Sequence, residues 1–286
     1  MRITLTILAL AFFVSCASPP DPIPLSAVDP SYAKRGEYLV KSVAACGFCH
    51  GKESVPDSSL SGGRRQVDGY GEAVALNLTP DETGLKGWDL TTITKAIRNS
   101  LGKEDEGFSP AFHRGFEWMS DSDALSIAAY LQSLAPVKNN VERRSIGFLS
   151  RNTVGIFEAS AKEIHGYVPT VQKDNNLKYG EYLVNNVARC ERCHNSPGSL
   201  LENERYLEGG SIVEVEGEKK SSPGLKAAGG FGLSSWSSKD IVAYLRTGRT
   251  PDKREVDTKF CPIPFYRLAA TSDLEAIAAY LKSLTS

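Results

Sequence analysis

The chain has 286 residues, of which 41% are hydrophobic and 23% charged, which is typical of a globular protein with room for two domains. These proportions exclude a disordered chain and a multi-pass membrane fold. With 33 basic and 34 acidic residues the net charge is −1, so no strong field favours nucleic acid or an acidic substrate. We therefore expect a mixed, solvated surface and no nucleic-acid partner.

Residues 1–15 have the features of an export signal peptide. Arg2 supplies a positive charge, and the apolar run after it is shorter than the roughly 20 residues that a membrane-spanning helix needs. The run leads into a tetrapeptide that ends at Cys16 and resembles a bacterial lipoprotein box, except that Phe13 replaces the usual leucine. We expect lipidation at Cys16. The alternative is a plain secretory signal cut near Ala17, which leaves no anchor.

Residues 16–30 are expected to be a lipid-anchored, proline-rich tether. Prolines at positions 19, 20, 22, 24 and 30 favour an extended polyproline II conformation, which rises about 3.1 Å per residue. Together with the export signal, this segment predicts a protein on the periplasmic side of a bacterial membrane, attached through lipid.

The first folded unit, residues 31–136, is predicted to open with a helix from Tyr32 to Cys46. Leu39 and Val43 lie four residues apart and can stack on one face of that helix. A glycine inside a helix weakens it but lets a second helix approach closely. We therefore expect Gly36 to contact Tyr130 on the last helix of the unit.

Two pentapeptides match the C-x-x-C-H pattern of covalent haem attachment, one from Cys46 to His50 and one from Cys190 to His194. Cysteines at this spacing lie on one helical turn, so both thiols can bond one porphyrin edge, and the histidine can reach the iron from the same face. The sequence thus predicts two haem c groups, with these residues: Cys46, Cys49, Cys190 and Cys193 for attachment, and His50 and His194 as proximal iron ligands.

The segments around the pentapeptides repeat, which indicates an internal duplication. The sequence G-E-Y-L-V from Gly36 recurs from Gly180, and A-A-Y-L from Ala128 recurs from Ala278. Each copy of the repeated unit therefore contains one pentapeptide.

Within the first unit, residues 51–87 are rich in Gly, Ser and Pro and are expected to be mostly loop. A helix is predicted from Asp89 to Leu101. The pattern Ser120-x-x-Asp123 predicts the start of a last helix that runs to about Leu134.

Residues 137–176 are expected to be a linker or strap between the units, with a short helix around 146–157. His165 lies in this stretch, and we expect a structural or solvent-facing role for it, with a distal haem ligand as the alternative. The second unit, residues 177–286, should contain a strand over 211–216. Trp236 should start its middle helix, and a second capping pattern, Ser272-x-x-Glu275, should start its last.

Other motifs extend the likeness to a known family: N-L-T-P from Asn77, Thr83-Gly84, Trp88 and the closing A-A-Y-L. With the pentapeptides, they resemble bacterial di-haem cytochromes c of two class I cytochrome c domains, found in cytochrome subunits of alcohol and sugar-acid dehydrogenases and in thiosulfate dehydrogenases. The resemblance covers roughly residues 31–286, although S-P-G-L from Ser222 replaces N-L-T-P in the second unit. It implies an all-α fold of two tandem domains, each wrapped with long loops around one covalent haem.

The resemblance also bears on the distal iron ligands. In that family a Met-Pro-Tyr-Pro segment before the last helix supplies the second axial ligand, and here Cys261 stands where the methionine belongs. We expect Cys261 to bind the second iron as thiolate, which should stabilise ferric iron and lower the potential. The alternative is a buried spectator cysteine beside a five-coordinate haem.

For the first haem, alignment of the two units on their last helices makes Ala111 the equivalent of Cys261, and alanine cannot bind iron. His113 in the same loop is our first candidate for the distal ligand. Met119 is the second, although it adjoins the helix cap Ser120, where apolar side chains often pack as a staple. An open sixth site is the third.

These features predict electron transfer between a redox donor, such as a dehydrogenase or a quinol-linked complex, and an acceptor, with no catalytic residue. Membership of a larger dehydrogenase complex is compatible with this reading. The alternative is a haem enzyme that oxidises a small sulfur compound at the Cys261-ligated haem. Thiosulfate dehydrogenases carry a His/Cys haem, but theirs belongs to the first domain.

Overall fold

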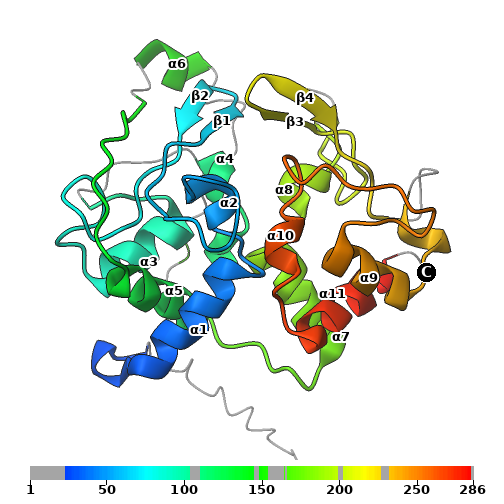
Figure 1. The fold of residues 1–286 in the computed structure, drawn as a ribbon, viewed down its shortest axis with the longest axis horizontal. Helices are drawn as coiled ribbons and strands as arrows, with labels where there is room; N and C mark the ends of the chain where they lie inside the picture. The colour runs from blue at the N-terminus through cyan, green and yellow to red at the C-terminus, as the bar shows by residue number, and fades with distance from the viewer. Residues whose placement is uncertain are drawn as a thin grey trace, which may run out of the picture.

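A computed structural model of the chain describes these residues: 23–103, 110–144, 148–153, 164, 166–198, 202–226 and 232–284. The predictions for the export signal, for Cys16 and for His165 lie outside the described residues. The chain forms two mainly helical halves that lie side by side, one on each side of Figure 1. Helices predominate and the only described strands form two short hairpins, so the predicted helical class is confirmed in outline.

The first half contains, in chain order, η1 (Leu25–Ala27), α1 (Pro30–Lys41), α2 (Gly47–His50), β1 (Arg65–Asp68), β2 (Gly71–Val74), α3 (Leu90–Asn99), α4 (Pro110–His113), η2 (Phe116–Trp118) and α5 (Asp121–Ser133). Then come α6 (Phe148–Thr153), α7 (Asn176–Tyr182), η4 (Leu183–Val187), α8 (Glu191–His194), β3 (Ile212–Val215), β4 (Glu218–Ser221), η5 (Leu233–Ser235), α9 (Ser238–Thr247), α10 (Ile263–Tyr266) and α11 (Thr271–Ser283). Both strand pairs, β1–β2 and β3–β4, are antiparallel. Among the described helices, none is long and apolar enough to cross a membrane.

Each half is built on a close crossing of its first and last helices, and a glycine makes that crossing possible. A Cβ atom on Gly36 would lie 1.9 Å from the carbonyl oxygen of Ser126 and 2.8 Å from Cβ of Tyr130. In the second half, a Cβ on Gly180 would lie 2.0 Å from the Ala276 carbonyl oxygen. The predicted contact between Gly36 and Tyr130 is therefore confirmed, and it is repeated.

Gly36→Ala should lower the free energy of unfolding by roughly 3 kcal/mol, because the new methyl group has to push α5 away from α1. Denaturant unfolding of the haem-loaded protein measures this loss. Lys34→Ala, at an exposed position of the same helix, is the matched control and should change stability by less than about 0.5 kcal/mol. Equal stability of Gly36→Ala and Lys34→Ala would contradict the predicted role of the crossing.

The two halves exchange equivalent hydrogen bonds. The Tyr182 hydroxyl donates to the Asp123 carboxylate (2.8 Å) and accepts from the backbone N–H of Ser120 (3.2 Å). In the opposite direction, the Tyr38 hydroxyl donates to the Asp273 carboxylate (2.8 Å) and accepts from the backbone N–H of Ala270 (2.9 Å). Each tyrosine thus forms hydrogen bonds with the N-terminus of the last helix of the other half. The two halves are therefore joined by reciprocal contacts.

The predicted helix from Tyr32 to Cys46 is wrong at its end. α1 begins after the cap Asp29, whose side chain accepts from Ser31 N–H, but it ends at Lys41. Ala45 then has a left-handed φ of 47°, which turns the chain sharply before α2. The first pentapeptide therefore lies on a one-turn helix of its own.

The predicted cap of the last helix is also wrong. α11 begins at Thr271, with Ala270 as its N-cap and no side-chain cap. Asp273 is fully buried and is bound by Tyr38, Tyr179 and Lys173. Tertiary partners from elsewhere in the chain thus satisfy this helix start, in place of the local Ser272-x-x-Glu275 pattern.

The predicted starts of α3, α5 and α9 agree with the structure to within two residues. Asp89 and Ser120 are caps just before α3 and α5, and each side chain accepts from a backbone N–H in the first helical turn. The middle helix of the second half starts after the cap Ser237, one residue beyond Trp236. A short helix, α6, lies within the predicted 146–157 segment.

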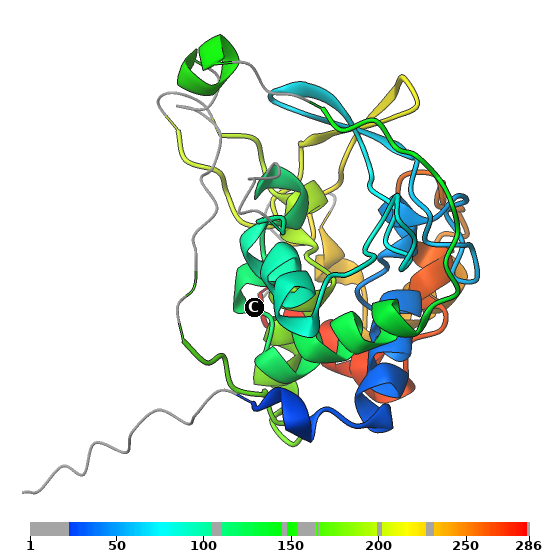
Figure 2. The same ribbon diagram turned by 90° about the vertical axis from the view of Figure 1, so that its left-hand side faces the viewer.

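The predicted strand over 211–216 is confirmed as β3, but the β1–β2 hairpin lies within the 51–87 segment that we predicted to be mostly loop. Residues 137–144 run from α5 along the first half toward this hairpin (Figure 2). Asn77 donates to the Val137 carbonyl oxygen (2.8 Å), and Arg144 pairs with Asp68 (2.6 Å). This part of the strap therefore closes over the loops of the first half.

Candidate haem-binding sites

The first pentapeptide places two thiols and an imidazole on one helical turn. Cys46 is the N-cap of α2 in right-handed helical conformation, and His50 N–H donates to its carbonyl oxygen (2.9 Å). Cys46 and Cys49 are both free cysteines. Burial raises the pKa of the Cys46 thiol to about 12, so the group is held as a neutral thiol.

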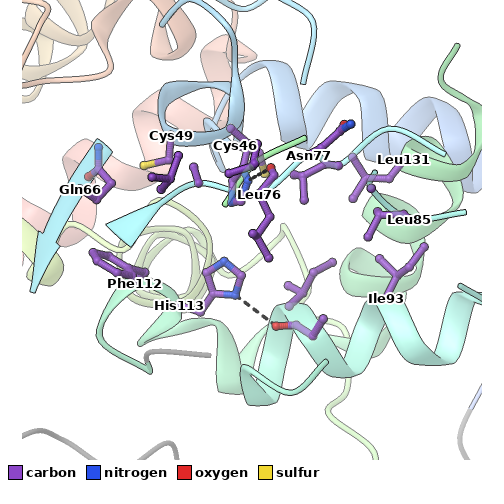
Figure 3. Close-up of a pocket in the computed structure, with 18 of the residues that line it drawn as sticks. Cys46, Cys49, Gln66, Leu76, Asn77, Leu85, Ile93, Phe112, His113 and Leu131 are labelled. Carbon is purple, nitrogen blue, oxygen red and sulfur yellow. Dashed lines mark hydrogen bonds between the residues drawn. The ribbon is translucent and has the colours of Figure 1, made fainter. Parts of the chain in front are cut away.

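A cavity of about 480 Å³ opens beside these side chains, within the size range of cofactor sites (Figure 3). Its lining includes both cysteines and two histidines, His50 and His113. The rest of the lining is largely apolar, and includes Leu76, Leu85, Trp88, Ile93, Ile97, Phe112, Phe116, Ile127 and Leu131.

The two histidines of the cavity come from α2 and α4. Their ring centroids are 6.3 Å apart, with the ring planes inclined by 58°. A metal–imidazole bond is about 2 Å long and the ring centre lies about 1 Å beyond the nitrogen, so two imidazoles on one metal ion have centroids about 6 Å apart. The spacing of His50 and His113 therefore suits two axial ligands of one iron.

Both imidazoles are also held with the same nitrogen free. Nδ1 of His50 donates to the Leu76 carbonyl oxygen (2.8 Å), and Nδ1 of His113 donates to the Ala96 carbonyl oxygen (3.1 Å; Figure 3). Such outer bonds fix the tautomer and orientation of metal-binding histidines. Burial lowers the pKa of both rings, that of His113 to about 3, so both are neutral and Nε2 can act as a ligand.

The cavity residues fit a haem. Two thiols are available for thioether bonds, two neutral imidazoles are available for the iron, and apolar walls surround them. The guanidinium of Arg189 also lines the cavity, and its Nε is buried without a hydrogen-bond partner. An orphaned cationic donor suits the anionic propionates of such a group.

The structure does not bring Met119 to this cavity. Met119 is fully buried in the hydrophobic core, between η2 and α5, and is not among the lining residues. Ala111 lies in α4, two residues before His113. Of the sequence candidates for the first distal ligand, His113 is therefore the one placed opposite His50.

The second pentapeptide repeats the geometry of the first. Cys190 is the N-cap of α8, and His194 N–H donates to its carbonyl oxygen (2.9 Å). Nδ1 of His194 donates to the Pro223 carbonyl oxygen (2.7 Å), as His50 does to Leu76. The S-P-G-L segment thus provides the carbonyl that the segment before N-L-T-P provides in the first half.

Cys261 lies beside the second pentapeptide. The Tyr244 hydroxyl and the sulfurs of Cys193 and Cys190 all lie close enough to the Cys261 sulfur to interact with it electrostatically. Burial raises the pKa of the Cys261 thiol to about 12. Tyr266 is buried against the same three sulfurs, and burial raises its pKa well above the ordinary value. The structure therefore gathers Cys261 with the second attachment residues.

Comparison with known proteins gives relatives that match most of the chain, whereas no family model matches. The chain is 30% identical to a fructose dehydrogenase cytochrome subunit of Gluconobacter japonicus, over 98% of the chain and 58% of the relative. It is 29% identical to an alcohol dehydrogenase (quinone) cytochrome c subunit of Gluconobacter oxydans, over 90% of the chain and 55% of the relative. A diheme cytochrome c-type of Cereibacter sphaeroides is 28% identical, over 87% of the chain and 85% of the relative.

The chain is a homologue of these cytochromes c. The names of these relatives as cytochromes c point to haem c as the cofactor. The chain spans a little over half the length of the fructose and alcohol dehydrogenase subunits. The relatives' names give no support to the alternative of an enzyme that oxidises sulfur compounds.

Sequence reasoning missed two arginines of this cytochrome c homologue. Arg189 precedes the second pentapeptide, yet it lines the cavity of the first half. Arg192 lies inside the second pentapeptide, yet it contacts Cys49, a lining residue of that cavity. Comparison of the two repeats could have indicated these arginines, because the equivalent positions in the first half hold the uncharged residues Ala45 and Phe48.

Proposed function

We propose that the chain is a dihaem c-type cytochrome built of two tandem class I domains, residues 31–136 and 177–286. One haem is attached through Cys46 and Cys49, and the other through Cys190 and Cys193. The observation that carries the proposal is the pair of neutral imidazoles, His50 and His113, which face each other across a thiol-lined cavity with both Nδ1 atoms engaged.

In this proposal His50 and His194 are the proximal ligands, and His113 and Cys261 are the distal ligands of the first and second iron. Haem supplies a one-electron ferric/ferrous couple. The chain's own residues would hold the three histidines in fixed orientation through backbone carbonyls, and the apolar walls of the first cavity would exclude water. Little rearrangement is then needed between oxidation states.

The electron donor in this proposal is a dehydrogenase subunit, because several relatives are named as cytochrome subunits of dehydrogenases. An acceptor protein then receives the electrons. The chain is exported and held on the periplasmic side of a bacterial membrane by a lipid on Cys16. The proline-rich segment after Cys16 supports a tether long enough to let the folded part reach both partners.

Haem counting tests the proposal. The protein made with a haem-attachment system should retain two haems per chain after acid–acetone extraction. The Cys46→Ala, Cys49→Ala double variant and its counterpart, Cys190→Ala, Cys193→Ala, should each retain one. A parent protein without covalently retained haem would contradict the proposal.

A further inference from the structure

Arg189 belongs to the second half but lines the cavity of the first. Its guanidinium carbon lies 3.7 Å from the centroid of the Phe116 ring, and its Nη1 donates to the Phe112 carbonyl oxygen (2.5 Å). Both of these residues also line the cavity. Burial and the neighbouring Arg192 lower the pKa of Arg189 to about 10, which still leaves it charged at neutral pH.

Arg192 reaches across the same boundary. Its guanidinium contacts Sγ of Cys49 (3.8 Å) and donates to the Gln66 side-chain oxygen (3.3 Å), and it lies 5.5 Å from the centroid of the Phe112 ring. Cys49, Gln66 and Phe112 are all cavity residues of the first half.

Neither arginine forms an ion pair with a described carboxylate. Across the part of the chain that the structure describes, no ion pair joins Arg189 or Arg192 to a carboxylate, whereas Arg35, Arg98 and Arg144 are paired with aspartates. The positive charges of two half-buried arginines therefore lie at the walls of one cavity. Solvent screens a charge less in a partly buried site than at the surface, so their field acts on whatever occupies the cavity.

The side-chain contacts of both arginines lie at the first site. Arg189 contacts Phe116 and Arg192 contacts Cys49, and both of these residues line the cavity of the first half. Among the described residues, His194 is hydrogen-bonded to the Pro223 carbonyl oxygen and to neither arginine. The two guanidinium groups are thus directed at the site of the other half.

We propose that Arg189 and Arg192 are positioning residues of the second half that raise the reduction potential of the first haem. The inference rests on the proposed dihaem function. Reduction adds one electron to the site, and nearby positive charge stabilises the reduced state, with little screening in a buried site. The potential of a bis-histidine centre in the first half is then tuned by the attachment segment of the second.

Comparison with the first repeat identifies a variant that should leave the backbone unchanged. Arg189 has a left-handed φ of 52°, and Ala45 has a φ of 47° at the equivalent position, so Arg189→Ala preserves a backbone conformation that alanine already adopts in this fold. Arg192→Gln removes the second charge, and Arg189→Lys keeps the first. Arg205→Gln removes an exposed charge of the second half that is paired with Glu208, and it is the control for net charge.

A redox titration of the haem-loaded protein, followed by optical and EPR spectra, measures both potentials. The signal of the first haem is the one lost in the Cys46→Ala, Cys49→Ala variant. In Arg189→Ala the equilibrium constant for reduction of the first haem should fall about tenfold, which is about 59 mV for one electron. Arg192→Gln should lower it in the same direction, and the second haem should shift less in both variants. Arg189→Lys and Arg205→Gln should match the parent.

Unchanged potentials of the first haem in both Arg189→Ala and Arg192→Gln would overturn the inference. So would a larger shift at the second haem, or an equal shift in Arg205→Gln. A parent with two covalent haems and no such shifts contradicts this inference alone, whereas a parent without covalent haem contradicts the proposed function.

Discussion

His113→Ala should abolish the low-spin ferric signal of the first haem while the signal of the second remains. His50 and His113 lie opposite each other with centroids 6.3 Å apart, and the other described residues of the cavity lining offer no sixth ligand of comparable strength. The first iron should become high-spin and should bind added cyanide or carbon monoxide, which the six-coordinate parent resists. Low-temperature EPR and ligand-binding spectra measure both effects.

Met119→Leu is the matched control for this experiment, because it removes the rival ligand from the sequence while keeping the volume of a buried side chain. It should leave the low-spin signal of the first haem as in the parent. A low-spin signal that survives in His113→Ala and disappears in Met119→Leu would reverse the ligand assignment.

Much of the fold follows from local patterns. The C-x-x-C-H spacing needs only one turn of helix, and such a turn forms at both sites. The contact between Gly36 and Tyr130 could be predicted because a duplicated sequence presents the same pair twice, as Gly180 and Tyr280. The cap at Ser120 could also be predicted, since a side chain that binds the start of its own helix is a short-range feature. The start of a helix at Asp89 was predicted as well, and the structure shows Asp89 to be its cap.

The features that could not be predicted depend on contacts between the halves. The last helix starts at Thr271 because Tyr38, far away in sequence, binds the backbone of Ala270. Arg189 and Arg192 reach the first cavity only because the halves interlock. A single sequence carries no direct record of such contacts.

The distal ligand of the first haem could be predicted only in part. Alignment with the second half pointed to Ala111, which cannot bind a metal, and left His113 as a nearby candidate. The decisive feature is the hydrogen bond from His113 Nδ1 to the Ala96 carbonyl oxygen on α3, which turns the ring toward His50. That bond depends on how α3 packs against α4, so the sequence identified the residue without its orientation.

Cys261→Met should raise the potential of the second haem and remove a thiolate signature from its ferric spectrum. Burial raises the pKa of the Cys261 thiol to about 12, so the chain alone would keep it protonated. Iron binding must then supply the stabilisation of the thiolate. A neutral thioether favours ferrous iron more than an anionic sulfur does, so the equilibrium constant for reduction should rise at least tenfold, which is about 59 mV.

Tyr244→Phe gives the matched comparison, because it keeps Cys261 and removes only the hydroxyl that lies beside its sulfur. A neighbouring hydroxyl that can donate to a thiolate weakens its electron donation to the metal, so loss of the hydroxyl should lower the potential of the second haem. Ligation by Cys261 therefore predicts shifts of opposite sign in the two variants, whereas general loosening of the pocket would move both in one direction. If Cys261→Met keeps the potential and ferric spectrum of the parent, the sulfur is a spectator.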